Sequence, residues 1–470
     1  MINLSPLMKY SHTVKVLEQC QISPPSGSVL KTSLPLSFFD LWCLAVQPPV
    51  HCLSFYRLES SKTNFMHSMI PHMKHSLSLT LQYFIPLTGN LIWSPESTVP
   101  EIVYVDGDSV SFTIVESDFS FDYLCENHPR DAKEFSPLNT PLLPRSSATG
   151  EIEYPLLALR VTLFPNSGIC VGLSISHAVT DGMTANNFLR LWASICSNLG
   201  GDTTNMLSHL LPSFDKTTII NPDGIETIYL NYLKKINISQ KSFVLPLTPT
   251  DFGNDKVVAT FIMDLPKIQK LKKWVLSRII EKTKNEPSFN LSAVVVTCAY
   301  VWACLVKALG GDSLSEHLAI PIDCRTRLDP ALPEAYFGNC LMVSFTTMNN
   351  NDLVGKDGIA VAAEVIGKAI QTIAKSVFDG SENLLANLIS LRSERLLAIA
   401  GSPRLKVYDI NFGWGKPNKV EIISATAGLG YVSLCERGNH EDGGLEIGIA
   451  LKKVEMDVFT SLFEYTLSSM

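Results

Sequence analysis

The sequence lacks the short motifs that mark several large classes of enzyme. It contains no Gly-x-Gly-x-x-Gly and no Walker loop, so neither a dinucleotide-binding fold nor a P-loop is expected. It contains no Gly-x-Ser-x-Gly, which argues against a serine hydrolase. Three histidines, His67, His72 and His75, have no cysteine or carboxylate partner at ligand spacing. We therefore expect them on an exposed helix face and expect no metal site.

Charge is also scarce, at 18% of residues, and the 38 basic and 45 acidic residues leave a net charge of −7. This balance disfavours nucleic acid or an anionic membrane surface as a partner. The 11 cysteines are scattered, odd in number and without a Cys-x-x-Cys pair. Free thiols in a reducing cytoplasm explain this usage better than a disulfide frame. Residues Met1–Gln19 do not have the pattern of a signal peptide.

Long hydrophobic runs are limited to Leu291–Val306, which is uncharged. This run is shorter than the ~20 residues that span a bilayer. We expect it to form a helix buried in a large core, with no membrane partner.

The chain is too long for one ordinary core, with 470 residues of which 46% are hydrophobic. Irregular alternation of strand-like and helix-like segments predicts an α+β or a mixed α/β fold. We expect an N-terminal domain at residues 1–206, a crossover segment at 207–250 and a C-terminal domain at 251–470. The elements that the pattern predicts most clearly are a helix at Phe65–Phe84, two strands within Glu151–Ile175 joined by a turn at Pro165–Gly168, a strand at Val257–Leu265 and a helix at Pro266–Thr283.

The segment His-Ala-Val-Thr-Asp-Gly, from His177 to Gly182, lies between an apolar strand, Gly168–Ile175, and a predicted helix, Met183–Leu199. Imidazole titrates near neutral pH, so a histidine at a strand end is suited to act as a general base. Asp181 can orient His177 or hold the turn. On these six residues alone, an interior histidine followed by an aspartate helix cap is an equally good interpretation.

A second candidate is the loop at Tyr408–Pro417, which contains Asn411-Phe412-Gly413-Trp414-Gly415-Lys416. Two glycines let the backbone bend closely around a ligand, and Lys416 adds a cation. A tight loop around a core tryptophan is the structural alternative.

Both segments, in this order, resemble motifs of the BAHD family of plant acyl-CoA-dependent acyltransferases, which carry His-x-x-x-Asp-Gly and Asp-Phe-Gly-Trp-Gly. Further similar segments are Leu34–Asp40, Phe84–Gly89, Asp323–Arg325 and Tyr336–Cys340. The last two resemble the subgroup that acylates anthocyanins and other phenolic glycosides.

The resemblance implies two domains of the chloramphenicol-acetyltransferase type with a channel between them. It places His177 at the centre as the base. Asp181 would pair with Arg325, the indole N–H of Trp414 would stabilise the oxyanion, and Asn411, Gly413 and Gly415 would support the site. No metal or cofactor is implied, because acyl-CoA is a co-substrate.

The implied activity is transfer of a malonyl or hydroxycinnamoyl group from CoA to a sugar hydroxyl of a phenolic glycoside, by a monomer. For the CoA phosphates we expect basic or helix-capping residues, namely Lys282, Lys284, Ser292 and Lys416. The alternatives are a non-catalytic ligand-binding relative, an esterase, or an acyltransferase for a different alcohol or an amine.

Three departures from the family pattern are present. Ile85 stands where the family usually has Tyr, a change that we attribute to packing. Asn411 stands where the family has Asp, which removes an expected ion pair with an arginine. We expect the segment Arg325–Arg327 to supply the counter-charge if Asp is restored. Met183 stands where malonyl-using relatives often have Lys, and no basic residue lies between His177 and Arg190. The carboxylate of a malonyl group therefore lacks an evident cation in this segment.

Overall fold

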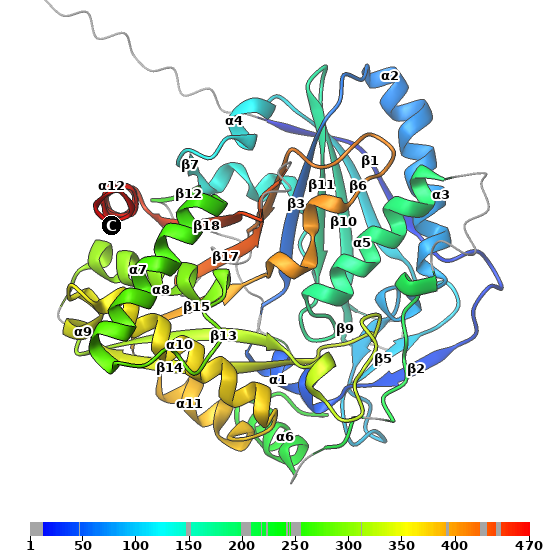
Figure 1. Cartoon of the computed structure of the whole chain (residues 1–470). Coiled ribbons are helices and arrows are strands. Elements are labelled where there is room, and N and C mark those ends of the chain that lie inside the picture. The colour runs from blue at the N-terminus through cyan, green and yellow to red at the C-terminus, as the bar shows by residue number, and fades with distance from the viewer. Residues whose placement is uncertain are drawn as a thin grey trace, which may run out of the picture.

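The computed structural model describes residues 13–46, 48–146, 152–198, 208–217, 219–221, 224–240, 243, 245, 255–311, 313–391, 394–423, 430–438 and 443–470. Two large twisted sheets lie side by side, one with strands mostly from the first half of the chain and one with strands mostly from the second (Figure 1). The mixed α/β class predicted from the sequence is confirmed.

The first sheet has six strands in the order β1-β6-β10-β11-β3-β16. These are β1 (Val14–Ile22), β3 (Val50–Arg57), β6 (Val110–Ser117), β10 (Leu157–Phe164), β11 (Gly168–Ile175) and β16 (Lys419–Ile422). The predicted hairpin is β10 and β11, which pair antiparallel around the turn at Pro165–Gly168. Every residue of β11 is buried, which explains its uninterrupted apolar and small side chains.

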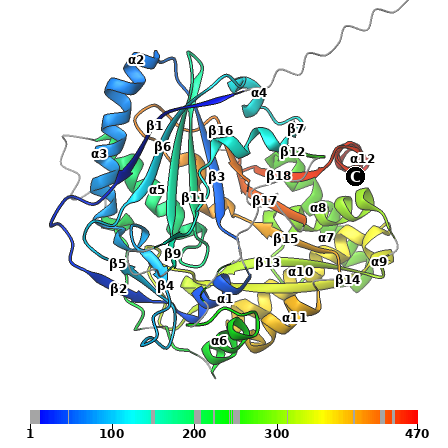
Figure 2. The same cartoon turned by 180° about the vertical axis from the view of Figure 1, so that it is seen from behind.

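The second sheet has seven strands in the order β14-β13-β15-β17-β18-β12-β7. These are β7 (Arg130–Asp131), β12 (Lys256–Met263), β13 (Ser315–Asp323), β14 (Leu341–Asn349), β15 (Leu396–Ala400), β17 (Gly430–Glu436) and β18 (Leu445–Lys452). A smaller five-stranded sheet lies beside the first one (Figure 2), with strands β2 (Thr32–Pro35), β4 (Asn90–Ile92), β5 (Glu101–Tyr104), β8 (Arg145–Ser146) and β9 (Ile152–Pro155).

Helices pack against both large sheets (Figure 1). Their bounds are α1 (Phe38–Val46), α2 (Lys62–Asn64), α3 (Ile70–Leu81), α4 (Phe121–Cys125), α5 (Gly182–Ser197), α6 (Ile225–Lys235), α7 (Leu265–Thr283), α8 (Ala293–Leu309), α9 (Asn350–Val354), α10 (Gly358–Lys375), α11 (Leu384–Ser390) and α12 (Lys453–Ser469). The predicted helix from Phe65 is a short π-helical turn, Phe65–Met69, continued by α3. His67, His72 and His75 are exposed there, as expected.

The apolar run at Leu291–Val306 forms most of α8, which begins at the cap residue Ser292. Its residues 295–306 are all buried, so this helix lies within the main hydrophobic core. None of the described helices combines the length and apolarity that crossing a membrane requires.

The two large sheets exchange edge strands. β16, from the second half of the chain, pairs with β3, and β7, from the first half, pairs with β12. Arg130 of β7 forms a buried ion pair with Glu421 of β16, at 2.8 Å. The exchange and this ion pair tie the halves together. The predicted boundaries at residues 206 and 251 lie outside the described residues, so the domain division stays a prediction.

Candidate active site

His177 lies in the short connection between the end of β11 and the start of α5. Asp181 is the N-cap of α5, because its Oδ1 accepts a hydrogen bond from the Thr184 backbone N–H at 3.0 Å. The aspartate of the motif therefore ends the turn that carries the histidine. Asp181 thus caps the helix, which is the structural interpretation that the sequence also allowed.

Asp181 also forms a buried ion pair with Arg325, which follows β13 of the second sheet. Arg325 Nη1 lies 2.7 Å from Asp181 Oδ2, and Nη2 lies 3.0 Å from Oδ1, in a bidentate arrangement. The Cys340 backbone N–H donates to Oδ2 at 3.1 Å. The pairing of Asp181 with Arg325 that the resemblance implied is confirmed. It joins the His177 turn to the second half of the chain.

The electrostatics keep this pair ionised. Burial alone raises the pKa of Asp181, but the Arg325 charge and the hydrogen bonds to the carboxylate outweigh it, and the pKa lies below its ordinary value. Both oxygens of Asp181 are occupied by these donors. Asp181 therefore positions the turn and does not take a proton from substrate.

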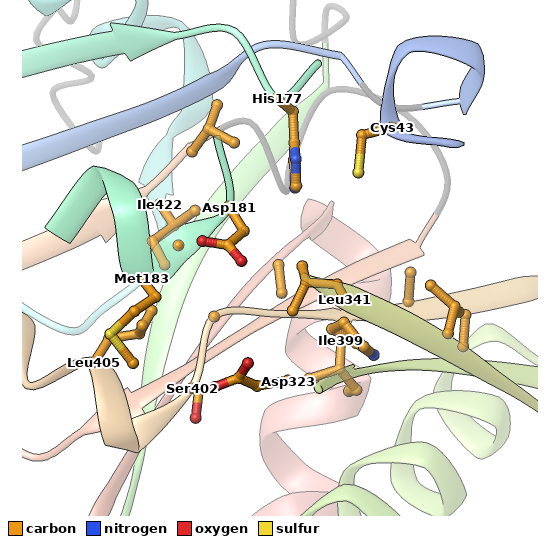
Figure 3. A pocket seen from close by; sticks show the side chains of 18 of the residues that line it. Cys43, His177, Asp181, Met183, Asp323, Leu341, Ile399, Ser402, Leu405 and Ile422 are labelled. Carbon is orange, nitrogen blue, oxygen red and sulfur yellow. The ribbon is translucent and has the colours of Figure 1, made fainter. Parts of the chain in front are cut away.

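A cavity of about 240 Å³ opens beside His177 (Figure 3). Its polar lining comes from His177, Asp181, Asp323, Arg325, Ser402, Arg404 and Tyr431, and its larger apolar lining comes from Trp42, Pro48, Val50, Met183, Leu341, Val343, Ile399, Leu405 and Ile422. In Figure 3 His177 points into the cavity from one side, next to Cys43, while Asp323 and Ser402 lie on the opposite side. Residues from both halves of the chain thus form the wall.

His177 is a neutral imidazole in this setting. Burial lowers its pKa below the ordinary value, because an imidazolium loses solvation there. Its Nδ1 is buried, so Nε2 is the nitrogen that serves the cavity. A neutral imidazole with an accessible nitrogen is competent to remove a proton from a hydroxyl group.

The neighbouring Cys43 is not an activated nucleophile. Burial raises the pKa of its thiol well above the ordinary value, and the charges of Asp40 and Asp181 act in the same direction. A reactive cysteine needs a depressed pKa. His177 is therefore the reactive group that the geometry favours.

The structure places Trp414 away from His177, which corrects its predicted role as the oxyanion donor. The Trp414 ring packs edge-on against Tyr56, with centroids 5.9 Å apart. Val50, on the same strand, pairs with Ile175 next to the His177 turn. Tyr56 lies six residues further along β3, or about 20 Å at ~3.4 Å per residue. The partly buried indole packs against the core at the opposite end of the first sheet.

The rest of this loop is structural as well. Gly413 and Gly415 adopt positive φ angles of 101° and 98°, which favour glycine. Asn411 Oδ1 accepts hydrogen bonds from both of their N–H groups, at 2.8 Å and 3.0 Å. Lys416 pairs with Asp409 at 2.7 Å and does not line the cavity, and its contact with CoA stays a prediction.

The prediction that the segment Arg325–Arg327 would supply a counter-charge for residue 411 is also wrong. Arg325 is committed to Asp181 and Asp323, and Arg327 donates to the Asp323 carbonyl. Arg325 lines the cavity and Arg327 follows it two residues later, whereas Asn411 lies in the remote loop. Asn411 stabilises the loop through its hydrogen bonds to the backbone of Gly413 and Gly415.

The remaining predicted CoA ligands do not line the cavity either. Ser292 caps α8, with its hydroxyl oxygen accepting from the Val295 N–H at 3.2 Å. Lys282 and Lys284 are exposed at the end of α7. Their contact with CoA stays a prediction.

Sequence reasoning missed three residues that the structure brings to the site. Arg404 lines the cavity, and Asp40 and Asn339 lie behind His177. Asp40 and Asn339 belong to segments that resembled family motifs, Leu34–Asp40 and Tyr336–Cys340, but their roles were not evident. The sequence therefore pointed to these two segments but did not indicate what Asp40 and Asn339 do.

Comparison with known proteins agrees with this architecture. The family model described as Transferase family matches residues 12–466, so the chain belongs to that family. Among curated relatives, it is 36% identical to malonyl-coenzyme A:anthocyanin 3-O-glucoside-6''-O-malonyltransferase of Dahlia pinnata, over 97% of each chain.

The chain is also 37% identical to phenolic glucoside malonyltransferase 1 of Nicotiana tabacum, covering 96% of this chain and 99% of the relative. Among solved structures, vinorine synthase matches with a TM-score of 0.68 and 22% identity, over 96% of this chain and 98% of the other. The resemblance to the BAHD acyltransferases is therefore confirmed, and so is the predicted two-domain fold class.

The first prediction concerns the ion pair. Either Asp181→Asn or Arg325→Gln leaves one buried partner uncompensated, and we expect each to cost about 3–5 kcal/mol of stability. The double variant should cost much less than the sum, with a coupling energy of at least about 0.5 kcal/mol. Chemical unfolding of the four proteins measures this. Additive effects would contradict direct pairing.

The second prediction concerns residue 411. Asn411→Asp keeps the oxygen that accepts from Gly413 and Gly415 and adds charge to those hydrogen bonds. We expect an equal or higher melting temperature and an activity within about tenfold of the parent, or ~1.4 kcal/mol of barrier. Thermal unfolding and initial rates test this. A large rise in turnover from a nearly inactive parent would mean that Asn411 suppresses catalysis.

Proposed function

We propose that this protein is an acyl-CoA-dependent O-acyltransferase that moves a malonyl or hydroxycinnamoyl group to a sugar hydroxyl of a phenolic glycoside such as an anthocyanin. The observation that carries the proposal is the neutral, half-buried His177 in a cavity between the two halves of the chain. Similarity over nearly the whole chain to glycoside malonyltransferases supports the choice of substrates.

In the proposed reaction, His177 Nε2 removes the proton from the acceptor hydroxyl as its oxygen attacks the thioester carbonyl. The C–O bond forms, and the tetrahedral intermediate then expels CoA thiolate as the C–S bond breaks. The thiolate takes the proton back from His177, so the base is regenerated. The thioester supplies the free energy, and the proposal includes no cofactor.

The cavity wall favours the acyl group and the aglycone over bulk water. Most of the lining is apolar, which suits an aromatic or aliphatic ligand. We propose that Ser292, Lys282 and Lys284 meet the CoA phosphates, since a helix N-terminus and exposed lysines suit anions. We also propose that the protein acts as a monomer in the cytoplasm, where its free cysteines would stay reduced.

The third prediction tests the base. His177→Ala should lower acceptor-dependent release of CoA by about 10²–10⁴-fold, because the general base is lost. The assay follows free thiol with malonyl-CoA or coumaroyl-CoA, with and without a phenolic glucoside, and identifies the ester by mass spectrometry. His75→Ala, an exposed histidine on α3, is the matched control and should keep full activity.

Three outcomes would overturn the proposal. Near-normal turnover by the His177→Ala variant would contradict the mechanism. CoA release that does not depend on added glycoside would indicate a thioesterase, and its absence with every acyl-CoA and glycoside would support a binding protein.

The fourth prediction separates the two acyl groups. Among the described arginines that line the cavity, Arg325 is paired with Asp181 and Asp323, whereas Arg404 forms no ion pair with a described residue. Arg404 is therefore the cation available to a malonyl carboxylate. Arg404→Gln should raise KM for malonyl-CoA about tenfold or more, as for loss of one ~1.4 kcal/mol contact, and leave KM for coumaroyl-CoA unchanged.

The matched control is Lys406→Gln, an exposed cation two residues away that does not line the cavity. It should change neither KM. An equal loss with both acyl-CoAs in the Arg404→Gln variant would show that Arg404 serves the CoA part or the acceptor instead.

A further inference from the structure

Two segments that resemble family motifs, Leu34–Asp40 and Tyr336–Cys340, have no part in the mechanism above and meet directly behind His177. Asp40 lies in the first turn of α1, and Asn339 lies just before β14. Asp40 Oδ1 accepts from the backbone N–H and the side-chain Nδ2 of Asn339, at 2.9 Å and 3.0 Å. Asn339 Nδ2 also donates to the backbone carbonyl of His177 at 2.9 Å. Asp40 and Asn339 are fully buried.

The chemistry of these contacts fixes which way the Asn339 amide points. A carboxylate oxygen and a backbone carbonyl only accept hydrogen bonds. Both contacts of the amide therefore require its nitrogen, which uses both of its hydrogens. Asn339 Oδ1 must point elsewhere.

Two buried atoms at this place have no hydrogen-bond partner among the described residues, Asn339 Oδ1 and His177 Nδ1. One is an obligate acceptor. The other is a donor in the imidazolium and in the Nδ1–H tautomer. Leaving both unpaired is costly, so a hydrogen bond between them is favourable.

We propose that Asn339, held by Asp40, is a positioning residue whose Oδ1 accepts a hydrogen bond from His177 Nδ1–H, both in the neutral base and after Nε2 has taken up the substrate proton. This inference rests on the proposed function, since it assigns the tautomer of the same base. With Nδ1 protonated, Nε2 faces the cavity as the acceptor of the substrate proton. The Asn339 bond to the His177 carbonyl fixes the backbone at the same residue.

The charged and titratable groups around His177 shift its pKa in known directions. Burial lowers its pKa most, while its own backbone, Asp181, the Asn339 side chain and Asp40 each oppose the lowering. The other ionisable groups of the cavity wall are Cys43, Asp323, Arg325, Arg404 and Tyr431. Removing Asn339 Oδ1 should lower the pKa of His177 further, and placing a carboxylate there should raise it.

Asp40 also connects this cluster to the crossover segment. Its Oδ2 accepts from the Ser37 backbone N–H and hydroxyl, at 2.9 Å and 2.7 Å, and lies 3.3 Å from Lys216 Nζ. These three contacts fix the Asp40 carboxylate, whose other oxygen binds Asn339. A rigid anchor suits a residue that must keep the base oriented.

The test compares Asn339→Ala, Asn339→Asp and the parent. The pKa of His177 is measured by NMR of protein labelled at histidine Cε1, with the His177→Gln spectrum assigning the signal, so this readout needs no activity. We expect the pKa to fall in Asn339→Ala and to rise in Asn339→Asp. In parallel, kcat should fall about 10²-fold in Asn339→Ala, with KM for acyl-CoA within about twofold.

Asp40→Asn serves where an Asn339 variant fails to fold, and it should lower both the pKa of His177 and kcat. Opposite pKa shifts in the two Asn339 variants support the proposal. Unchanged pKa values with a lower melting temperature would overturn it, because Asn339 would then be merely structural. If the pKa shifts occur but the parent transfers no acyl group, the positioning contact stands and the proposed function fails.

Discussion

The buried ion pair between Asp181 and Arg325 is the interaction on which the rest of the site depends. It connects residues 144 positions apart and joins the turn after β11 to the segment after β13. Asp181 also accepts from two backbone N–H groups, and Arg325 also donates to Asp323 and to two backbone carbonyls, so both side chains are held in place by contacts inside the protein. The pair instead sets where His177 stands relative to the cavity wall supplied by the second half. A base that must contact two substrates has to be held in a fixed position, since a small displacement of a reacting group lowers the reaction rate.

Other contacts between the halves serve the same end. The edge strands β7 and β16 are exchanged between the two large sheets, and the ion pair of Arg130 with Glu421 lies buried between them. Asp40 and Asn339 add a hydrogen-bonded contact directly behind His177. The cavity thus lies at a junction that several independent interactions hold together, and most of its wall is apolar.

Local patterns in the sequence predicted what depends on neighbouring residues. The β10–β11 hairpin, the His177 turn and the buried helix α8 all follow from runs of apolar residues and from caps. The same reasoning failed for Trp414, because a motif says nothing of which end of a sheet it reaches. It also gave no role to Asn339, whose contact with Asp40 spans 299 positions. Contacts of that range follow from topology, which a single sequence does not display.

The central claim is that His177 acts directly on the acceptor, so that the acyl group passes from CoA to the hydroxyl in one step on the protein. Cys43 lies next to His177 in the cavity and is the competing nucleophile, although burial raises the pKa of its thiol. The most direct measurement is the mass of the intact protein after mixing with acyl-CoA in the absence of acceptor. The account predicts the unmodified mass. An acyl adduct that maps to Cys43 and disappears on addition of glycoside would contradict it.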